Sequence, residues 1–170
     1  WSWTELDAVD PQQGGAPLAH RDALKLLAVF LQHTDTKPRQ QRILCLDKVQ
    51  GMTPQQDGRC NHPFMMVNDL GKTFGRANLT NGDGKSAANF EEWSKVPVWK
   101  DDKGCVAHLS KSFSGSLKDP VISEGGRQFL AGLLAQLTDR QLHDLPAPKA
   151  PATLLPRILV ATGRLDRSPW

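Results

Sequence analysis

Hydrophobic and polar positions divide the chain into a few strong apolar runs separated by long polar stretches. The strongest run, Leu24–Leu31, lies within residues 21–32, which have helical spacing. This predicted helix has apolar side chains on both faces: Leu24, Leu27, Ala28 and Leu31 on one, and Leu26, Val29 and Phe30 on the other. A helix that is apolar all round is usually buried. We therefore expect residues 21–32 to lie at the centre of the domain.

Two shorter apolar runs predict a β-hairpin. Ile43–Leu46 and Phe64–Val67 each predict a strand, and the connection Asp47–Pro63 contains Gly, Pro and Gln. Pro38 prevents a helix from continuing through the polar stretch before the first strand, because proline cannot donate a backbone hydrogen bond. The predicted order is therefore helix, polar loop, strand, long turn and strand.

A second amphipathic helix is predicted after Ser123. Three residues on its polar side should be exposed: Arg127, Gln128 and Gln136. Five apolar residues repeat at helical spacing and should be buried: Phe129, Leu130, Leu133, Leu134 and Leu137.

The organisation of the chain changes after this helix. Thr138 and Gln141 belong to a capping box that predicts a further short helix through Leu145. Four prolines then fall within the eleven residues 146–156. We expect one domain over residues 1–145 and a Pro-rich extended tail over residues 146–170. The tail should hold at most a short ordered piece around Ile158 and contribute little to stability.

Composition adds limits on function. The 170 residues suffice for one domain with a hydrophobic core. The net charge is +3 and no block of like charges occurs, so we expect no nucleic-acid partner. No apolar run reaches the ~18 residues of a membrane-spanning helix, so we expect no membrane span. Nothing in the composition predicts a compartment.

The three cysteines match no zinc-binding spacing. Cys45 lies in an apolar run, where we expect a buried free thiol. Cys60 and Cys105 lie in polar loops and could form a disulfide in an oxidising compartment. An odd number of cysteines leaves the compartment open.

The candidate chemistry lies in two polar stretches, residues 33–42 and 68–71. Each follows an apolar element, and each presents a carboxylate, Asp35 in the first and Asp69 in the second. This arrangement suits metal-dependent phosphoryl transfer. Asp35 can accept a hydroxyl proton, Lys37 can neutralise phosphate charge, and Asp69 can hold Mg²⁺.

These residues also carry a resemblance. His33, Asp35, Lys37 and Gln40 are similar to the catalytic loop H-R-D-x-K-x-x-N of the protein-kinase-like superfamily, and 69–71 is similar to its D-F-G. The chain resembles more closely an uncharacterised bacterial kinase-like group with H-x-D-x-K-x-x-Q/N-Q-R followed by N-D-L-G-x-T-F-G. The resemblance covers about residues 3–145. It implies an α+β fold, mainly α: a kinase-like C-terminal lobe with a small β-hairpin at the active-site edge.

The resemblance implies a role for each site residue. Asp35 and Lys37 are the expected catalytic residues, and Lys37, Gln40 and Asp69 the expected contacts to ATP. Asp69 and Gln40 are the expected ligands of Mg²⁺. His33 is expected to support the loop from inside. The acceptor is a hydroxyl-bearing molecule of unknown class.

Three departures leave alternatives open. Gln40 replaces the usual Asn, so its carbonyl either reaches the metal or only holds the loop. Thr34 replaces the Arg that pairs with a phosphorylated activation loop, so we do not expect that form of control. Before His33 we find no Gly-rich flap and no strand Lys, so catalysis requires an N-terminal lobe from a longer parent protein. The alternatives are a degenerate kinase-like (pseudokinase) binding or scaffold module, and an unrelated disulfide-containing secreted domain.

Overall fold

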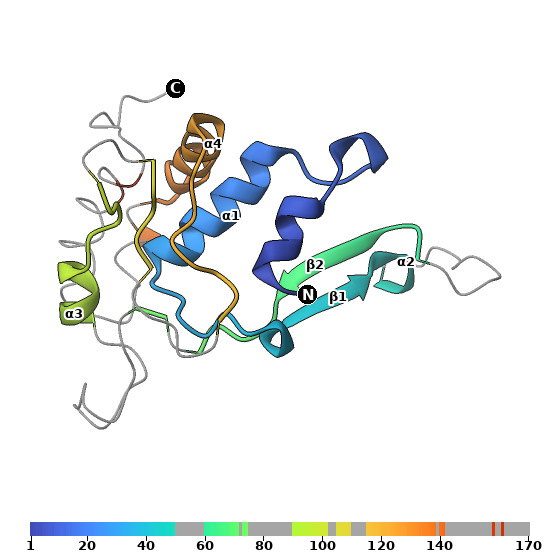
Figure 1. Cartoon of the computed structure of the whole chain (residues 1–170), viewed down its shortest axis with the longest axis horizontal. Helices are drawn as coiled ribbons and strands as arrows, with labels where there is room; N and C mark the ends of the chain where they lie inside the picture. Colours follow the sequence, from blue (N-terminus) through green and yellow to red (C-terminus); the bar gives the residue numbers. More distant parts are fainter. Residues whose placement is uncertain are drawn as a thin grey trace.

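The computed structural model describes residues 1–49, 60–71, 73–74, 90–101, 105–109, 115–138, 140–141, 158 and 161. These residues form α-helices and one two-stranded antiparallel sheet, so the α+β class is confirmed. Figure 1 shows the hairpin beside a group of helices. In chain order the elements are the 3₁₀ helices η1 (Trp3–Ala8) and η2 (Pro11–Gln13), α1 (Leu18–Phe30), η3 (Pro38–Gln40), β1 (Gln41–Cys45), α2 (Leu46–Val49), β2 (Pro63–Val67), α3 (Phe90–Lys95) and α4 (Glu124–Leu134).

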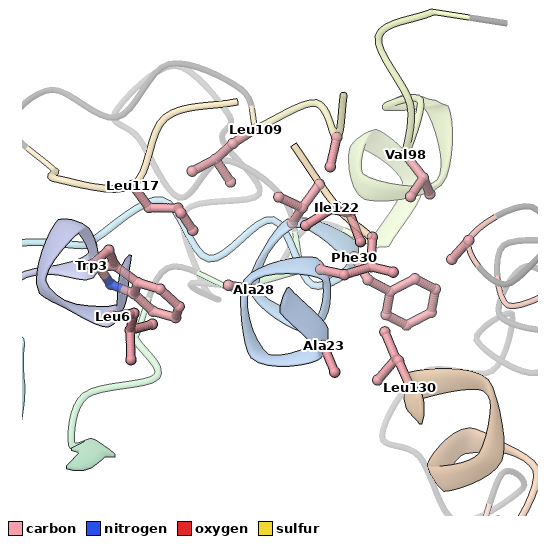
Figure 2. Close-up of a cluster of buried hydrophobic side chains, with 14 of the residues drawn as sticks. Trp3, Leu6, Ala23, Ala28, Phe30, Val98, Leu109, Leu117, Ile122 and Leu130 are labelled. Atoms are coloured by element: carbon pink, nitrogen blue, oxygen red, sulfur yellow. The ribbon is translucent and has the colours of Figure 1, made fainter. Parts of the chain in front are cut away.

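Helix α1 is central, as its apolar pattern predicts. It starts three residues earlier than expected, immediately after Pro17. Figure 2 shows core side chains on several sides of it, including Trp3 and Leu6 from η1 and Leu130 from α4. Because α1 is covered on so many sides, its C-terminal end is held firmly in the core. That end leads directly into the polar stretch 33–42.

Helix α4 packs closely against α1 at a glycine. A Cβ atom on Gly126 would lie only 2.5 Å from the Cβ of Asp22 in α1. The Oγ of Ser123 accepts a hydrogen bond of 3.2 Å from the Gly126 amide and caps the helix. The backbone amide of Ser123 donates to the Asp22 carboxylate at 3.0 Å. The start of α4 is therefore fixed to the side of α1.

The predicted inner face of α4 is partly wrong. Leu130 is buried and Leu134 half-buried, but Phe129, Leu133 and Leu137 are 38%, 47% and 36% exposed. The helix approaches α1 through Gly126, Leu130 and Ala131, where small side chains allow close contact. Phe129 stacks on His20 of α1 at the rim of this contact, with ring centroids 4.0 Å apart, whereas Leu133 and Leu137 stay exposed. On the polar side, Gln128 and Gln136 are exposed as expected and Arg127 is half-buried.

The hairpin is confirmed with small shifts at its ends. β1 pairs with β2 antiparallel, in a register that runs from Gln41 opposite Val67 to Cys45 opposite Pro63. The first strand begins two residues earlier than predicted because Gln41 and Arg42 join the ladder. It ends before Leu46, which begins α2. Figure 1 shows β1 and β2 extending away from the end of α1.

The expected cysteine arrangement is wrong. Cys45 forms a disulfide with Cys60, fifteen residues away, and so is not a free thiol. Cys105 is exposed and takes no part in a disulfide. The hairpin explains this pairing, because its register places Cys45 opposite Pro63, close in sequence to Cys60. Spacing along the sequence does not reveal this proximity.

Few residues after α4 are described, and they bear on the expected capping box and on the expected extended tail. The capping box is present, since the Gln141 amide donates to Thr138 Oγ1 at 3.2 Å and the Thr138 amide to Gln141 Oε1 at 2.9 Å. Residues 142–157, 159–160 and 162–170 lie outside the described residues. Ile158 and Ala161 are helical, and Ala161 is completely buried in the core cluster. The tail therefore reaches the core at Ala161, close to the short ordered piece expected around Ile158, and its small contribution to stability stays a prediction.

Candidate functional site

The site begins where α1 ends in a Schellman motif. The amide of Gln32 donates to the carbonyl of Val29 at 2.9 Å, and the amide of His33 donates to the carbonyl of Ala28 at 2.8 Å. The motif needs a left-handed residue, and Gln32 takes this role with φ of 52°. Its side-chain Nε2 offsets the strain by donating to the carbonyls of Val29 (2.9 Å) and His108 (2.8 Å). The sharp turn sends His33 into the interior.

His33 is buried beneath the polar loop, as expected for a residue that supports it from inside. Its ring lies 6.3 Å from the Trp3 ring, measured between centroids. Among the described residues, neither of its ring nitrogens has a hydrogen-bond partner. Burial lowers the pKa of His33, and the negative charges of Asp35 and Asp69 partly oppose that effect. The ring is therefore neutral near pH 7, and both carboxylates lie close enough to act on it.

The middle of the loop is anchored at Thr36, which is completely buried. Its carbonyl accepts hydrogen bonds from the amide (3.1 Å) and the Oγ (3.2 Å) of Ser116, and its Oγ1 accepts one from the amide of Leu117 at 3.3 Å. Ser116 Oγ also accepts from the amide of Trp3 at 2.9 Å. The loop is thus tied to two distant segments of the chain. Sequence analysis missed these anchors, because no local pattern links residues eighty positions apart.

Asp35, Lys37 and Gln40 converge above this anchor. The ammonium of Lys37 lies 3.2 Å from Asp35 Oδ1, and Gln40 Nε2 donates to Asp35 Oδ2 at 3.1 Å. Pro38–Gln40 forms the 3₁₀ helix η3, which folds the chain back so that Gln40 reaches Asp35. A proline suits the first position of such a helix, because its missing amide proton is not needed there.

Asp69 follows β2 and lies at the same end of the hairpin as Gln40, which precedes β1. The amides of Asn68 and Asp69 both donate to the carbonyl of Gln40, at 2.9 and 3.3 Å. The Asp69 carboxylate accepts from the amide of Gly71 at 2.7 Å. A Cβ at position 71 would lie 2.8 Å from Asp69 Oδ1, so a larger residue there would displace the Asp69 carboxylate. All four residues with predicted site roles are therefore brought to one polar edge.

The segment after Asp69 returns to the end of α1, a feature that the sequence did not predict. The amide of Phe74 donates to the carbonyl of Leu31 at 2.7 Å. Its ring packs against Phe90 and Trp93 of α3, with centroids 5.1 and 5.5 Å apart. Trp93 Nε1 in turn donates to the carbonyl of Phe30 at 2.7 Å. This aromatic cluster positions both polar stretches relative to the same helix end.

The donor set at this edge suits a hard cation and a phosphate. The Asp69 carboxylate and the Gln40 side-chain carbonyl are hard oxygen donors. Mg²⁺ typically takes one or two carboxylates together with phosphate oxygens and waters. The Lys37 side chain is only 25% exposed and is the cation nearest Asp35 among the contacts described here. The edge thus combines a carboxylate base, a cation for phosphate and oxygen donors for a metal.

Comparisons with known proteins give no match. No protein-family model, no curated protein and no solved structure matches this chain. Within the described ranges, no helix combines the length and apolar character that crossing a membrane requires. Any functional assignment therefore depends on the residues and geometry of the chain itself.

Proposed function

We propose that the chain is the catalytic-lobe part of a kinase-like phosphotransferase, which transfers a phosphoryl group from ATP, with Mg²⁺, to a hydroxyl acceptor. Asp35 is the base that accepts the hydroxyl proton, and Lys37 neutralises charge on the transferred phosphate. Asp69 and Gln40 hold the metal. ATP and Mg²⁺ supply the phosphoryl donor and the charge neutralisation that this transfer needs.

One observation carries the proposal: Gln40 joins the two polar stretches. Its side-chain amide contacts Asp35, while its backbone carbonyl accepts the amides of Asn68 and Asp69. With Nε2 engaged by Asp35, the side-chain carbonyl Oε1 is the Gln40 atom that can face a metal. A base and a metal-binding carboxylate are thereby linked through one residue, as in-line phosphoryl transfer requires.

The neutral, buried His33 also supports the proposal of phosphoryl transfer. It fills the space beneath the loop without carrying charge into the core, and it lies within electrostatic reach of both Asp35 and Asp69. Its ring gives the loop a rigid base together with the Thr36 anchor. A catalytic base must be held within hydrogen-bond reach of the hydroxyl, and this requires rigid support.

Binding of Mg·ATP to the isolated chain is the test. Lys37 is partly exposed to water, which reduces its attraction to a phosphate towards ~1 kcal/mol. We therefore expect weak binding, with a dissociation constant of roughly 1 mM or about 4 kcal/mol, and no measurable phosphotransfer. With Mn²⁺ replacing Mg²⁺, paramagnetic broadening in NMR spectra should be strongest at the amides of Gln40 and residues 68–71.

Asp69→Asn and Asp10→Asn make a matched pair for this test. Each removes one carboxylate charge. Asp10 is exposed and caps η2, a role that asparagine fills equally well. We expect Asp69→Asn to abolish the binding and Asp10→Asn to preserve it. Micromolar binding that survives Asp69→Asn, or broadening centred elsewhere, would show that the nucleotide lies at another place and would refute the proposal.

A further inference from the structure

The far end of the hairpin carries a second group of chemically active side chains. Two short segments lie side by side there, Cys45-Leu46-Asp47 at the end of β1 and Cys60-Asn61-His62 before β2. The amide of Leu46 donates to the carbonyl of His62 at 3.0 Å and fixes the two segments to each other. Each segment therefore presents a cysteine and, two residues later, another potential metal ligand.

Asp47 is the buried centre of this group, with no exposed surface. Its Oδ2 accepts a hydrogen bond from the amide of Asn61 at 2.8 Å. Its Oδ1 lies 3.2 Å from the donating amide of His62 and 2.7 Å from His62 Nδ1. These contacts fix the position of the carboxylate beside the two cysteines. When the disulfide is reduced and both sulfurs are ionised, a buried carboxylate next to them needs a cation to offset the clustered negative charge.

The sulfur atoms are close enough to that carboxylate to share a metal. The Sγ atoms of Cys45 and Cys60 and a carboxylate oxygen of Asp47 all lie within 4.8 Å of one another. We propose that this cluster binds one Zn²⁺ when the Cys45–Cys60 disulfide is reduced. Thiolates select a borderline-soft ion such as Zn²⁺ over Mg²⁺. The ligands are Cys45, Cys60 and Asp47, a water takes the fourth position, and His62 is a positioning residue that orients the carboxylate.

Zinc binding follows reduction of the Cys45–Cys60 disulfide, and electrons and protons balance in both steps. A dithiol reductant gives two electrons and two protons to the disulfide, which becomes two thiols, and the reductant becomes a disulfide. Zn²⁺ then displaces one proton from each thiol, so about two protons are released for each ion bound near neutral pH. The two Zn–S bonds of ~2.3 Å hold the sulfurs about 3.8 Å apart in a tetrahedral site. Rotation of the two cysteine side chains provides this separation, while the hairpin register holds the backbone.

This site is separate from the proposed nucleotide site. Cys45 and Gln41 are the two ends of β1, which at the usual rise per residue lie about 13 Å apart. Gln40 and Asp69 lie beyond the Gln41 end. The zinc proposal therefore does not depend on the kinase-like proposal, and either one can fail alone.

The test uses the whole chain, reduced with a phosphine that supplies no thiol ligands of its own and becomes a phosphine oxide. Zn²⁺ is titrated against a chromophoric chelator, and Co²⁺ serves as a spectroscopic substitute. We expect one ion per reduced chain, thiolate-to-cobalt charge-transfer bands and a rise in the unfolding temperature with Zn²⁺. The oxidised chain should show none of these. Failure of the reduced chain to bind Zn²⁺ more tightly than the oxidised chain would overturn the proposal.

Variants identify the ligands. Cys45→Ser should abolish the charge-transfer bands of a two-thiolate site, whereas Cys105→Ser, which removes an exposed cysteine outside the disulfide, should leave binding unchanged. Asp47→Asn should weaken Zn²⁺ binding at least about tenfold, and His62→Gln by roughly 10–100-fold with unchanged charge-transfer bands. Circular dichroism of the oxidised Asp47→Asn variant checks its fold, because the disulfide holds the hairpin in that state. Full binding by a folded Asp47→Asn variant would refute the assigned ligand set.

Discussion

Gly126→Ala and Gly132→Ala make the same chemical change on α4, at one position packed against α1 and at one position with open space around it. A Cβ on Gly126 would meet the Asp22 Cβ at 2.5 Å and the Ala23 amide nitrogen at 3.3 Å. A Cβ on Gly132 would meet nothing within 4 Å. Carbon atoms prefer separations of about 3.5–4.0 Å, so the Gly126 variant must force α4 and α1 apart by roughly 1 Å.

The magnitudes follow from two opposing terms. Replacing glycine by alanine inside a helix stabilises it by about 0.8–1 kcal/mol. Overpacking costs about 1–3 kcal/mol, and at Gly126 the obstructing atoms include the backbone of α1. We therefore expect Gly132→Ala to raise the free energy of unfolding by about 0.5–1 kcal/mol. We expect Gly126→Ala to lower it by up to about 2 kcal/mol, because the overpacking cost exceeds the gain in helix propensity.

Thermal and denaturant unfolding of the two variants measures the difference directly. For a chain of this size, 1 kcal/mol corresponds to a shift of about 2–4 °C in the unfolding temperature. Because helix propensity changes equally in both variants, the gap between them reports packing alone. Equal shifts in the same direction would show that α4 does not approach α1 at Gly126, and the described arrangement of these helices would be wrong.

Two further predictions concern the core and the buried histidine. Leu130→Ala should cost about 2–5 kcal/mol as a core truncation, while Leu133→Ala should stay within about 0.5 kcal/mol of the parent; equal losses in chemical denaturation would contradict the exposed position of Leu133. Because burial lowers the pKa of His33, the folded chain binds this proton less readily than the unfolded chain. Stability should therefore fall as pH drops below about 6.5, and His33→Leu should remove that part of the slope in unfolding measured at several pH values.

Features encoded locally were predictable. The apolar run that forms α1, the Ser123 cap of α4 and the Thr138–Gln141 capping box each involve residues within a few positions of one another. The ends of the elements were less predictable. The pairing of β1 with β2 begins at Gln41 and ends at Cys45, so Gln41 belongs to the strand and Leu46 to the helix that follows. The side chains of these two residues do not indicate this.

Features that depend on distant partners were not predictable. The close approach of α4 to α1 at Gly126 decides which face of α4 is buried. That face includes Leu130, and Leu133 lies outside it. The disulfide depends on the hairpin register, which places Cys60 near Cys45. Ala161 is too small to stand out in a Pro-rich stretch, yet it is completely buried. In each case the deciding contact joins residues that no short pattern connects.

The candidate site shows both kinds of dependence. In an antiparallel hairpin, the residue before the first strand lies beside the residue after the second, so pairing of β1 with β2 alone brings Gln40 beside Asn68 and next to Asp69. Hairpin pairing thus accounts for the backbone part of the link that Gln40 makes between the two polar stretches. Pairing does not dictate that the Gln40 side chain reaches Asp35, that Lys37 lies 3.2 Å from the same carboxylate, or that an uncharged histidine fills the space beneath them. The proposal of phosphotransfer therefore rests on these side-chain contacts, and loss of Mg·ATP binding in Asp69→Asn tests whether they serve a nucleotide.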